Sequence, residues 1–193
     1  MGNGAGVSAY QRLRQKQVLC EAEGYLDLIT ALAEQWPLRA DVRDRVAERA
    51  LSALERLDST RGCEALMNYL RGQAFRIMER YQDAIPSLVR SAEIDPENIR
   101  VWLALGWCYK RTGRLDLAIQ SLEEALAVDK GQAIIHYNLA CYWGLANNPK
   151  LAVSYLTQAF HLDVSFRELV PSESDFDLIR EHPSFQELTR AVA

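Results

Sequence analysis

The sequence predicts an all-α fold: three repeated helical hairpins, a divergent helical hairpin before them and short capping helices after them. Five columns of residues recur every 34 positions, and apolar residues in both flanks recur at helical spacing. The composition is that of a globular protein, with 49% hydrophobic and 25% charged residues. The 193 residues are enough to bury a sizeable core.

The 34-residue period is the most informative of these features. The recurring columns are Gly72, Gly106 and Ala140; Phe75, Tyr109 and Trp143; Ala84, Ala118 and Ala152; Leu88, Leu122 and Leu156; and Ser91, Ala125 and Ala159. Small residues allow two helices to approach closely where they cross, while leucines and aromatic rings fill the neighbouring gaps. One hairpin cannot bury its apolar face alone, so consecutive units are expected to stack and share a core.

The period also predicts the bounds of the repeats. We expect hairpins over residues 65–98, 99–132 and 133–166, with turns near residues 79–81, 112–114 and 147–149. Pro96 ends the second helix of the first hairpin, because proline cannot continue a helix. Lys130 and Val164 stand where that proline would recur, so this column is lost.

Before the repeats, residues 9–64 are predicted to form the divergent hairpin. Apolar residues recur at helical spacing over residues 9–35 and again over residues 41–57, with a linker around residues 36–38. We expect this hairpin to cover the open end of the stack, as terminal repeats must. Residues 1–8 are predicted to be a flexible tail.

After the repeats, residues 167–193 are predicted to form a C-terminal cap. The period would demand another first helix here, but Pro171 interrupts it. Residues 175–191 are expected to form one or two short helices instead. Their apolar residues would cover the exposed face of the last hairpin: Phe176, Ile179, Phe185 and Leu188.

Taken together, residues 65–166 resemble the tetratricopeptide repeat family. The middle unit fits the family pattern at Trp102, Leu105, Gly106, Tyr109, Ala118, Leu122 and Ala125. The other units depart from it, with Asn68 and Arg71 in the first and His136 in the third at positions where Trp, Leu and Trp are usual. The resemblance implies a right-handed α-α superhelix in which the first helix of each unit lines a concave groove. It also implies a role in binding proteins rather than in catalysis.

Other classes of function find little support in the residues. The four cysteines are widely spaced and the three histidines are scattered, so we expect no metal site, and no catalytic or cofactor-binding motif is present. The net charge of −4 argues against nucleic acid as a partner. No apolar run is long enough to cross a membrane, and the N-terminus lacks the apolar core of a signal peptide. A cytoplasmic, non-enzymatic protein is expected.

Charge is divided unevenly between the two helices of each unit. Taken together, the first-helix segments, residues 65–78, 99–111 and 133–145, contain no acidic residue, and their basic residues are Arg71, Arg76, Arg100, Lys110 and Arg111; acidic residues predominate in the second helices. If the first helices line the groove, the groove is basic and suits an anionic peptide segment or the C-terminus of a partner protein. The alternative is that these are solvated faces whose bias in sign is accidental.

The family register gives the residues expected to face the groove. They are Tyr69, Gln73 and Arg76 in the first unit, Arg100, Leu103, Trp107 and Lys110 in the second, and Tyr137, Asn138 and Cys141 in the third. We expect aromatic anchoring by Trp107 and the tyrosines, and pairing of anions with Arg76, Arg100 and Lys110. The alternative for Trp107 is packing against the adjoining unit. Asn138 matches one residue of the carboxylate clamp with which some family members bind chaperones, but the rest of the clamp is missing.

These observations predict a non-catalytic adaptor or scaffold that binds a peptide segment of a partner protein in its concave groove. Two alternatives remain open at this point. One is a small bacterial secretion-type chaperone that holds a client protein. The other is a self-assembling scaffold, a homo-oligomer in which the cap or the N-terminal helix pairs two copies.

Overall fold

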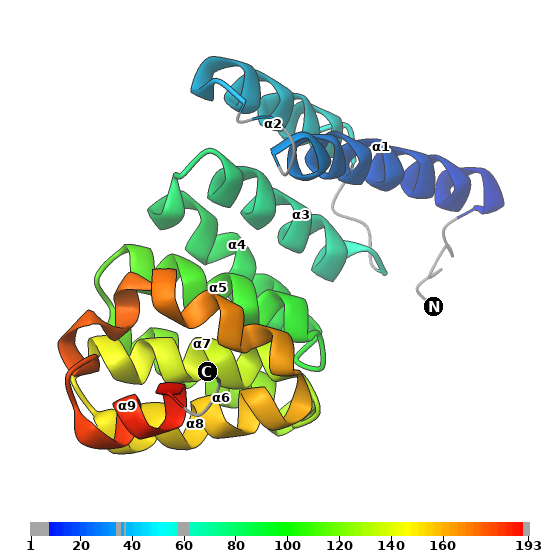
Figure 1. The fold of residues 1–193 in the computed structure, drawn as a ribbon. Coiled ribbons are helices and arrows are strands. Elements are labelled where there is room, and N and C mark those ends of the chain that lie inside the picture. Colours follow the sequence, from blue (N-terminus) through cyan, green and yellow to red (C-terminus); the bar gives the residue numbers. More distant parts are fainter. Residues whose placement is uncertain (1–7, 34–35, 37, 58–61, 191–193) are drawn as a thin grey trace, which may run out of the picture. The chain divides into compact units, whose positions relative to one another are not determined.

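In the computed structural model, residues 8–33, 36, 38–57 and 62–190 are described, and every regular element in these ranges is helical (Figure 1). The predicted all-α fold of paired helices is therefore confirmed. Contacts divide the protein into two compact units, Met1–Pro96 and Glu97–Ala193. The tail predicted over residues 1–8 lies outside the described residues, apart from Ser8.

Unit 1 consists of two helical hairpins that pack on each other. Its helices are α1 (Ala9–Ala33), α2 (Ala40–Leu54), α3 (Glu64–Ile77) and α4 (Tyr81–Ile94). The helices α1 and α2 pack together, α3 and α4 pack together, and α3 also contacts α1 and α2. The first hairpin thus covers one side of the second hairpin within this unit.

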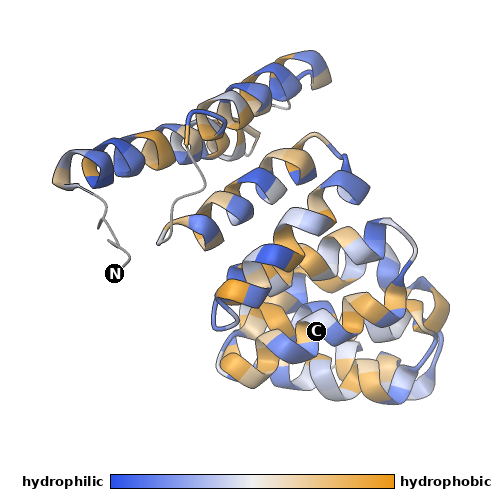
Figure 2. Cartoon of the chain, turned by 180° about the vertical axis from the view of Figure 1, so that it is seen from behind, coloured by the Kyte–Doolittle hydropathy of each residue, from blue (hydrophilic) through white to orange (hydrophobic). Residues whose placement is uncertain are grey.

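Unit 2 contains two further hairpins and the C-terminal segment. Its helices are α5 (Ile99–Arg111), α6 (Leu115–Val128), α7 (Ala133–Leu145), α8 (Pro149–Leu162), the 3₁₀ helices η1 (Val164–Ser172) and η2 (Ser174–Ile179), and α9 (Pro183–Arg190). The helix α7 contacts α6, α8 and η2, while η1 and α9 pack against α8. Hydrophobic residues are denser along the helices of this unit than along α1 and α2 (Figure 2).

The column of small residues lies where the two helices of a hairpin cross. A methyl group added at Gly72 would lie 2.5 Å from Cγ of Leu88, and one added at Gly106 would lie 3.2 Å from Cδ2 of Leu122. Both leucines are fully buried. The column therefore consists of small residues because a leucine of the second helix occupies the space that a larger side chain would need.

The turns inside the three repeated hairpins (α3–α4, α5–α6 and α7–α8) share a backbone conformation with the same period of 34 residues. Glu79, Gly113 and Asn147 have positive φ angles of 60°, 75° and 52°. This left-handed conformation ends the first helix of each hairpin, and it favours glycine and asparagine over other residues. In the third repeat (α7 and α8), the side chain of Asn148 caps the start of α8 by accepting a hydrogen bond from the backbone N–H of Leu151.

The C-terminal segment lies along α7 as well as α8. Pro171 falls inside η1, and the polypeptide continues through η2 to α9 without forming another long helix. Phe176, Ile179 and Phe185 are each at most 2% exposed and belong to the hydrophobic core of unit 2. Because α6, α8 and η2 all contact α7, most of the residues of α7 are buried.

Candidate peptide-binding surface

The residues expected to face a groove lie on α3, α5 and α7, the first helices of the last three hairpins. On α3, Tyr69 and Gln73 are buried and Arg76 is half-buried. The guanidinium Nε of Arg76 donates a hydrogen bond to the side-chain oxygen of Gln73 at 2.8 Å. Of these three residues, Arg76 alone offers substantial exposed surface to another protein.

On α5, the expected residues are more exposed. The side chain of Arg100 is exposed, and Trp107 retains 39% of its surface in contact with solvent. Leu103 is half-buried and packs against the core of unit 2. An exposed tryptophan and an exposed arginine on one helix are the residue types that dominate binding energy at protein interfaces.

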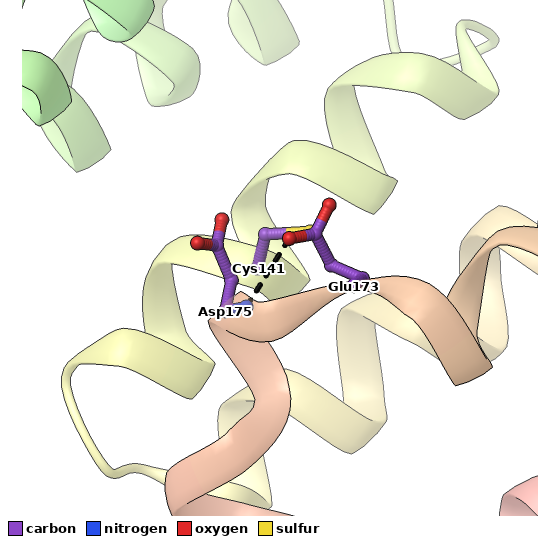
Figure 3. Close-up of side chains that lie close together, drawn as sticks. All are labelled: Cys141, Glu173 and Asp175. Atoms are coloured by element: carbon purple, nitrogen blue, oxygen red, sulfur yellow. Dashed lines mark hydrogen bonds between the residues drawn. The ribbon is translucent and has the colours of Figure 1, made fainter.

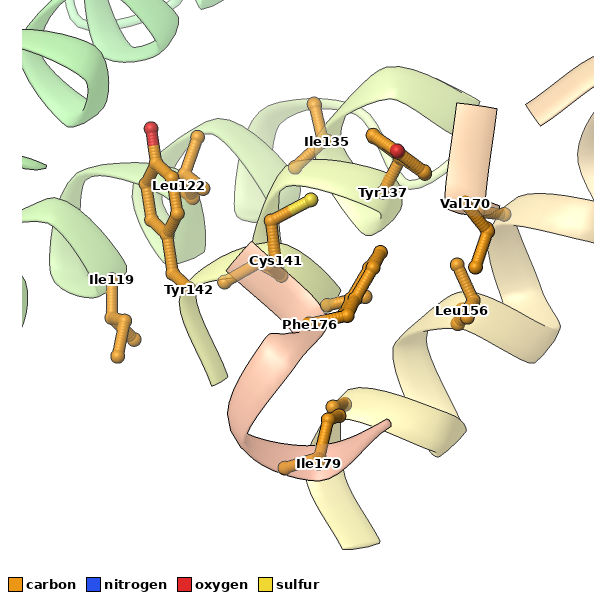
Figure 4. Packing of buried hydrophobic residues seen from close by; sticks show 14 of the residues in the cluster. Ile119, Leu122, Ile135, Tyr137, Cys141, Tyr142, Leu156, Val170, Phe176 and Ile179 are labelled. Carbon is orange, nitrogen blue, oxygen red and sulfur yellow. The ribbon is translucent and has the colours of Figure 1, made fainter. Parts of the chain in front are cut away.

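On α7, the structure places Tyr137 and Cys141 under the protein's own C-terminal segment. Tyr137 and Cys141 are 5% and 3% exposed, and Asn138 is half-buried. The ring of Tyr137 packs against the rings of Phe166 and Phe176, with centroids 5.0 Å and 6.1 Å apart. Figure 4 shows Phe176 and Val170 beside Tyr137 and Cys141. In this arrangement, Tyr137 and Cys141 cannot contact a partner.

An ion pair between Lys110 of α5 and Asp175 of η2 holds the segment in place. The two side chains are 17% and 8% exposed, so the pair is largely removed from water. The Lys110 ammonium also lies 5.3 Å from the ring centroid of Trp107 and 5.5 Å from that of Tyr142. Lys110 therefore serves the protein's own structure, and its charge is already matched by an acidic group.

Gly144 makes the close approach of the C-terminal segment possible. A methyl group added there would lie 2.8 Å from the backbone oxygen of Asp175 and 3.0 Å from the ring of Phe176. Gly144 stands 34 residues after Lys110, which stands 34 residues after Arg76. The third repeat thus has no side chain at the position where the first two carry a basic one. The absence of a side chain at this position is the feature of the sequence that could have indicated that another segment packs closely here.

Cys141, Glu173 and Asp175 form a compact cluster where η2 meets α7 (Figure 3). The thiol sulfur and one oxygen of each carboxylate lie within 4.8 Å of one another, a spacing that a metal ion could use. Each group has another role, however. One Glu173 oxygen accepts a hydrogen bond of 3.1 Å from the backbone N–H of Asp175 and so caps η2, while Asp175 pairs with Lys110.

The electrostatics of the cluster favour a protonated thiol. Burial raises the pKa of Cys141 far above its ordinary value, and the carboxylates of Glu173 and Asp175 raise it further. A metal ion would have to displace that proton and would lie beside the Lys110 ammonium. Because Lys110 already supplies the positive charge that the carboxylates need, we assign this cluster a structural role.

Within each of the two units the hairpins pack on each other, as in helical-repeat proteins, and a family model matches part of the sequence. Residues 76–140 match the tetratricopeptide repeat family. These residues lie within the stretch, residues 65–166, that resembles this family in sequence, and the match confirms the resemblance there. Repeats of this kind stack into extended concave surfaces that bind other proteins.

Solved structures show the same fold. "MamA MSR-1 C2" is 21% identical and superposes with a TM-score of 0.57 over 82% of this protein and 99% of that one. "MamA 41-end from Desulfovibrio magneticus RS-1" is 17% identical, with a TM-score of 0.57 over 83% of this protein and 98% of that one. At these identities the likeness concerns the fold alone.

A curated relative matches a shorter stretch. The anaphase-promoting complex subunit 3 of Dictyostelium discoideum is 41% identical over 51 residues, which are 26% of the present sequence and 5% of that protein. The match thus spans a small fraction of this relative's length.

None of the helices in the described ranges combines the length and the hydropathy that crossing a bilayer requires.

Proposed function

We propose that the protein is a non-catalytic adaptor that binds a peptide segment of a partner along the face of α5 that bears Arg100 and Trp107. One observation carries the proposal: residues 173–179 of the protein itself pack on α7 and are joined to α5 by the Lys110–Asp175 ion pair, on helices where the sequence predicts a peptide. This short acidic segment contributes a carboxylate to a lysine and an aromatic ring to a tyrosine. The segment therefore has the chemistry of the anionic peptide that is expected from the basic residues of the first helices.

Because the C-terminal segment covers Tyr137 and Cys141 of α7, the proposed peptide site in unit 2 is restricted to α5. Trp107 is the proposed aromatic anchor, Arg100 the proposed cation for an acidic side chain, and Leu103 the apolar contact between them. Tyr137 and Cys141 belong to the wall that supports residues 173–179, and Asn138 of the same helix is half-buried. In unit 1, Arg76 remains a candidate contact on α3, with Tyr69 and Gln73 packed beneath the surface.

We also propose that the protein works in a reducing compartment such as the cytoplasm. The four cysteines, Cys20, Cys63, Cys108 and Cys141, are not joined by disulfides. A client-holding chaperone would bind an unfolded client protein, and a self-assembling scaffold would pair two copies through the cap or the N-terminal helix. These alternatives differ from the adaptor in the partner that they retain, namely an unfolded client or a second copy.

Affinity capture from a lysate of the source organism tests the proposal. Wild type is compared with Arg100→Glu and Trp107→Ala, each at two salt concentrations. Lys150→Glu on α8, which makes the same change of charge at another exposed position, is the matched control. Loss of a partner in both α5 variants, with retention in the control, would support the adaptor. Equal retention by all four proteins would place the contact elsewhere and reject the α5 site.

A further inference from the structure

A cavity of about 430 Å³ lies in the C-terminal part of unit 2, apart from the α5 surface. Residues of α8, η1 and α9 line it, because η1 and α9 both pack against α8 and leave space at the surface between them. The volume falls within the range of small-molecule sites, about 300–1,000 Å³. Neither the repeat pattern nor the proposed peptide site makes use of this cavity.

The inner wall of the cavity is apolar. Phe160 of α8, Val170 of η1 and Phe185 of α9 line it, and these side chains are 7%, 4% and 2% exposed. All three also belong to the core of unit 2, so the wall is rigid. Such a wall favours the hydrocarbon part of a ligand.

At the rim, Arg167 presents a fixed guanidinium group. Its central carbon lies 4.3 Å from the ring centroid of Phe160, and Nη1 donates a long hydrogen bond of 3.4 Å to the backbone oxygen of Leu188. No carboxylate of the described residues forms an ion pair with it. The stacking holds the planar group in one orientation, and most of its N–H donors remain available to a ligand.

The two other charged groups at the cavity differ from Arg167. Arg180 donates hydrogen bonds to the backbone oxygens of Val170 and Glu173 and to the carboxylate of Asp177, so its donors serve the C-terminal segment. Glu168 is exposed, and no ion pair with it is present among the described residues. Its negative charge opposes an anion at the rim.

We propose that this cavity binds a small apolar carboxylate, with the hydrocarbon part on Phe160, Val170 and Phe185 and the carboxylate on the Arg167 guanidinium. An apolar wall with a single preorganised cation suits an aryl-alkyl acid or an aliphatic acid of medium length. A neutral molecule of the same shape would forgo the charge-assisted hydrogen bonds. A polar anion such as phosphate would gain nothing from the apolar wall.

Titration calorimetry of the full-length protein with 4-phenylbutyrate tests this site, and 4-phenylbutanamide serves as the neutral probe. We expect the acid to bind at least about tenfold more tightly than the amide. Arg167→Gln should remove most of that difference, and Glu168→Gln should strengthen binding of the acid about twofold. Arg114→Gln is the matched control, because Arg114 also stacks on an aromatic ring, 4.8 Å from that of Tyr109, outside the cavity lining.

Three results would overturn the proposal: absence of acid binding, equal binding of acid and amide, or an unchanged affinity in folded Arg167→Gln. Circular dichroism of each unliganded variant establishes that it is folded. If Arg167→Gln does not fold, the acid–amide comparison and the response to Glu168→Gln still decide the question. Trp107→Ala should bind the acid as wild type does, which keeps this site separate from the peptide site.

Discussion

Lys110 and Asp175 form an ion pair across 65 residues of sequence, and the pair joins α5 to the C-terminal segment. The two side chains are at most 17% exposed, so removal of either one would leave the charge of the other largely removed from water and without a partner. The segment is therefore part of the folded core of unit 2. A partner at α5 would bind beside this segment without replacing it.

Asp175→Asn should destabilise the protein by about 2–4 kcal/mol, because it leaves the Lys110 ammonium without its counter-charge. Urea unfolding followed by circular dichroism measures the loss. In the double variant Lys110→Met with Asp175→Asn, the cost should be smaller than the sum of the two single changes. Strict additivity would mean that the two side chains do not interact energetically.

Gly144→Ala should destabilise unit 2 by about 1–3 kcal/mol, because its methyl group would lie 2.8 Å from the backbone oxygen of Asp175. Hydrogen exchange should become faster in residues 173–179 before it does so in α5 or α6. Gly24→Ala on α1 is the control, since nothing lies within 4 Å of the added methyl group. That change should stabilise α1 by up to about 1 kcal/mol. Unchanged exchange in residues 173–179 would contradict the proposed close approach.

The repeats could be predicted from the sequence because their contacts recur with a fixed period. Gly72 and Gly106 each pack against a leucine of the second helix, and the third repeat has Ala140 and Leu156 at the same positions, so the three copies indicate the pairing without any structure. The path of the C-terminal segment could not be predicted in this way, because it occurs once and depends on contacts distant in sequence. The excess of basic residues in the first helices likewise pointed to Lys110, but it did not indicate that Asp175 is its partner. Helical periodicity indicates which face a residue lies on, but not what covers that face.

The two crossing glycines should respond differently to the same substitution. Gly72→Ala should cost about 1–2 kcal/mol, because the methyl group would meet the fully buried Leu88 at 2.5 Å. Gly106→Ala should be close to neutral, because its contact with Leu122 is 3.2 Å and alanine gains helix propensity. Thermal unfolding of both variants decides this. An equal loss in both would mean that the crossings are packed alike.

The left-handed backbone conformation at position 113 should require glycine. With φ at 75° and nothing within 4 Å of an added methyl group, Gly113→Ala introduces backbone strain without a steric clash with other residues. We expect a loss of about 1 kcal/mol in urea unfolding. Asn147→Gly, at the equivalent turn with φ at 52°, should be neutral or slightly stabilising. A stable Gly113→Ala variant would show that the turn can adopt another conformation.

The buried thiol of Cys141 should make stability depend on pH in the alkaline range. Because burial raises its pKa in the folded state, the unfolded protein releases this proton first, near the ordinary thiol pKa of 9.0. Below that pH both states are protonated and the thiol contributes no pH dependence; above it, stability should fall as pH rises. Urea unfolding between about pH 8.5 and pH 10 should therefore show a smaller decline in Cys141→Ala than in wild type. The substitution also removes buried volume, so the slope against pH is the informative quantity and not the absolute stability. Parallel slopes would mean that the thiol does not stay protonated in the folded protein.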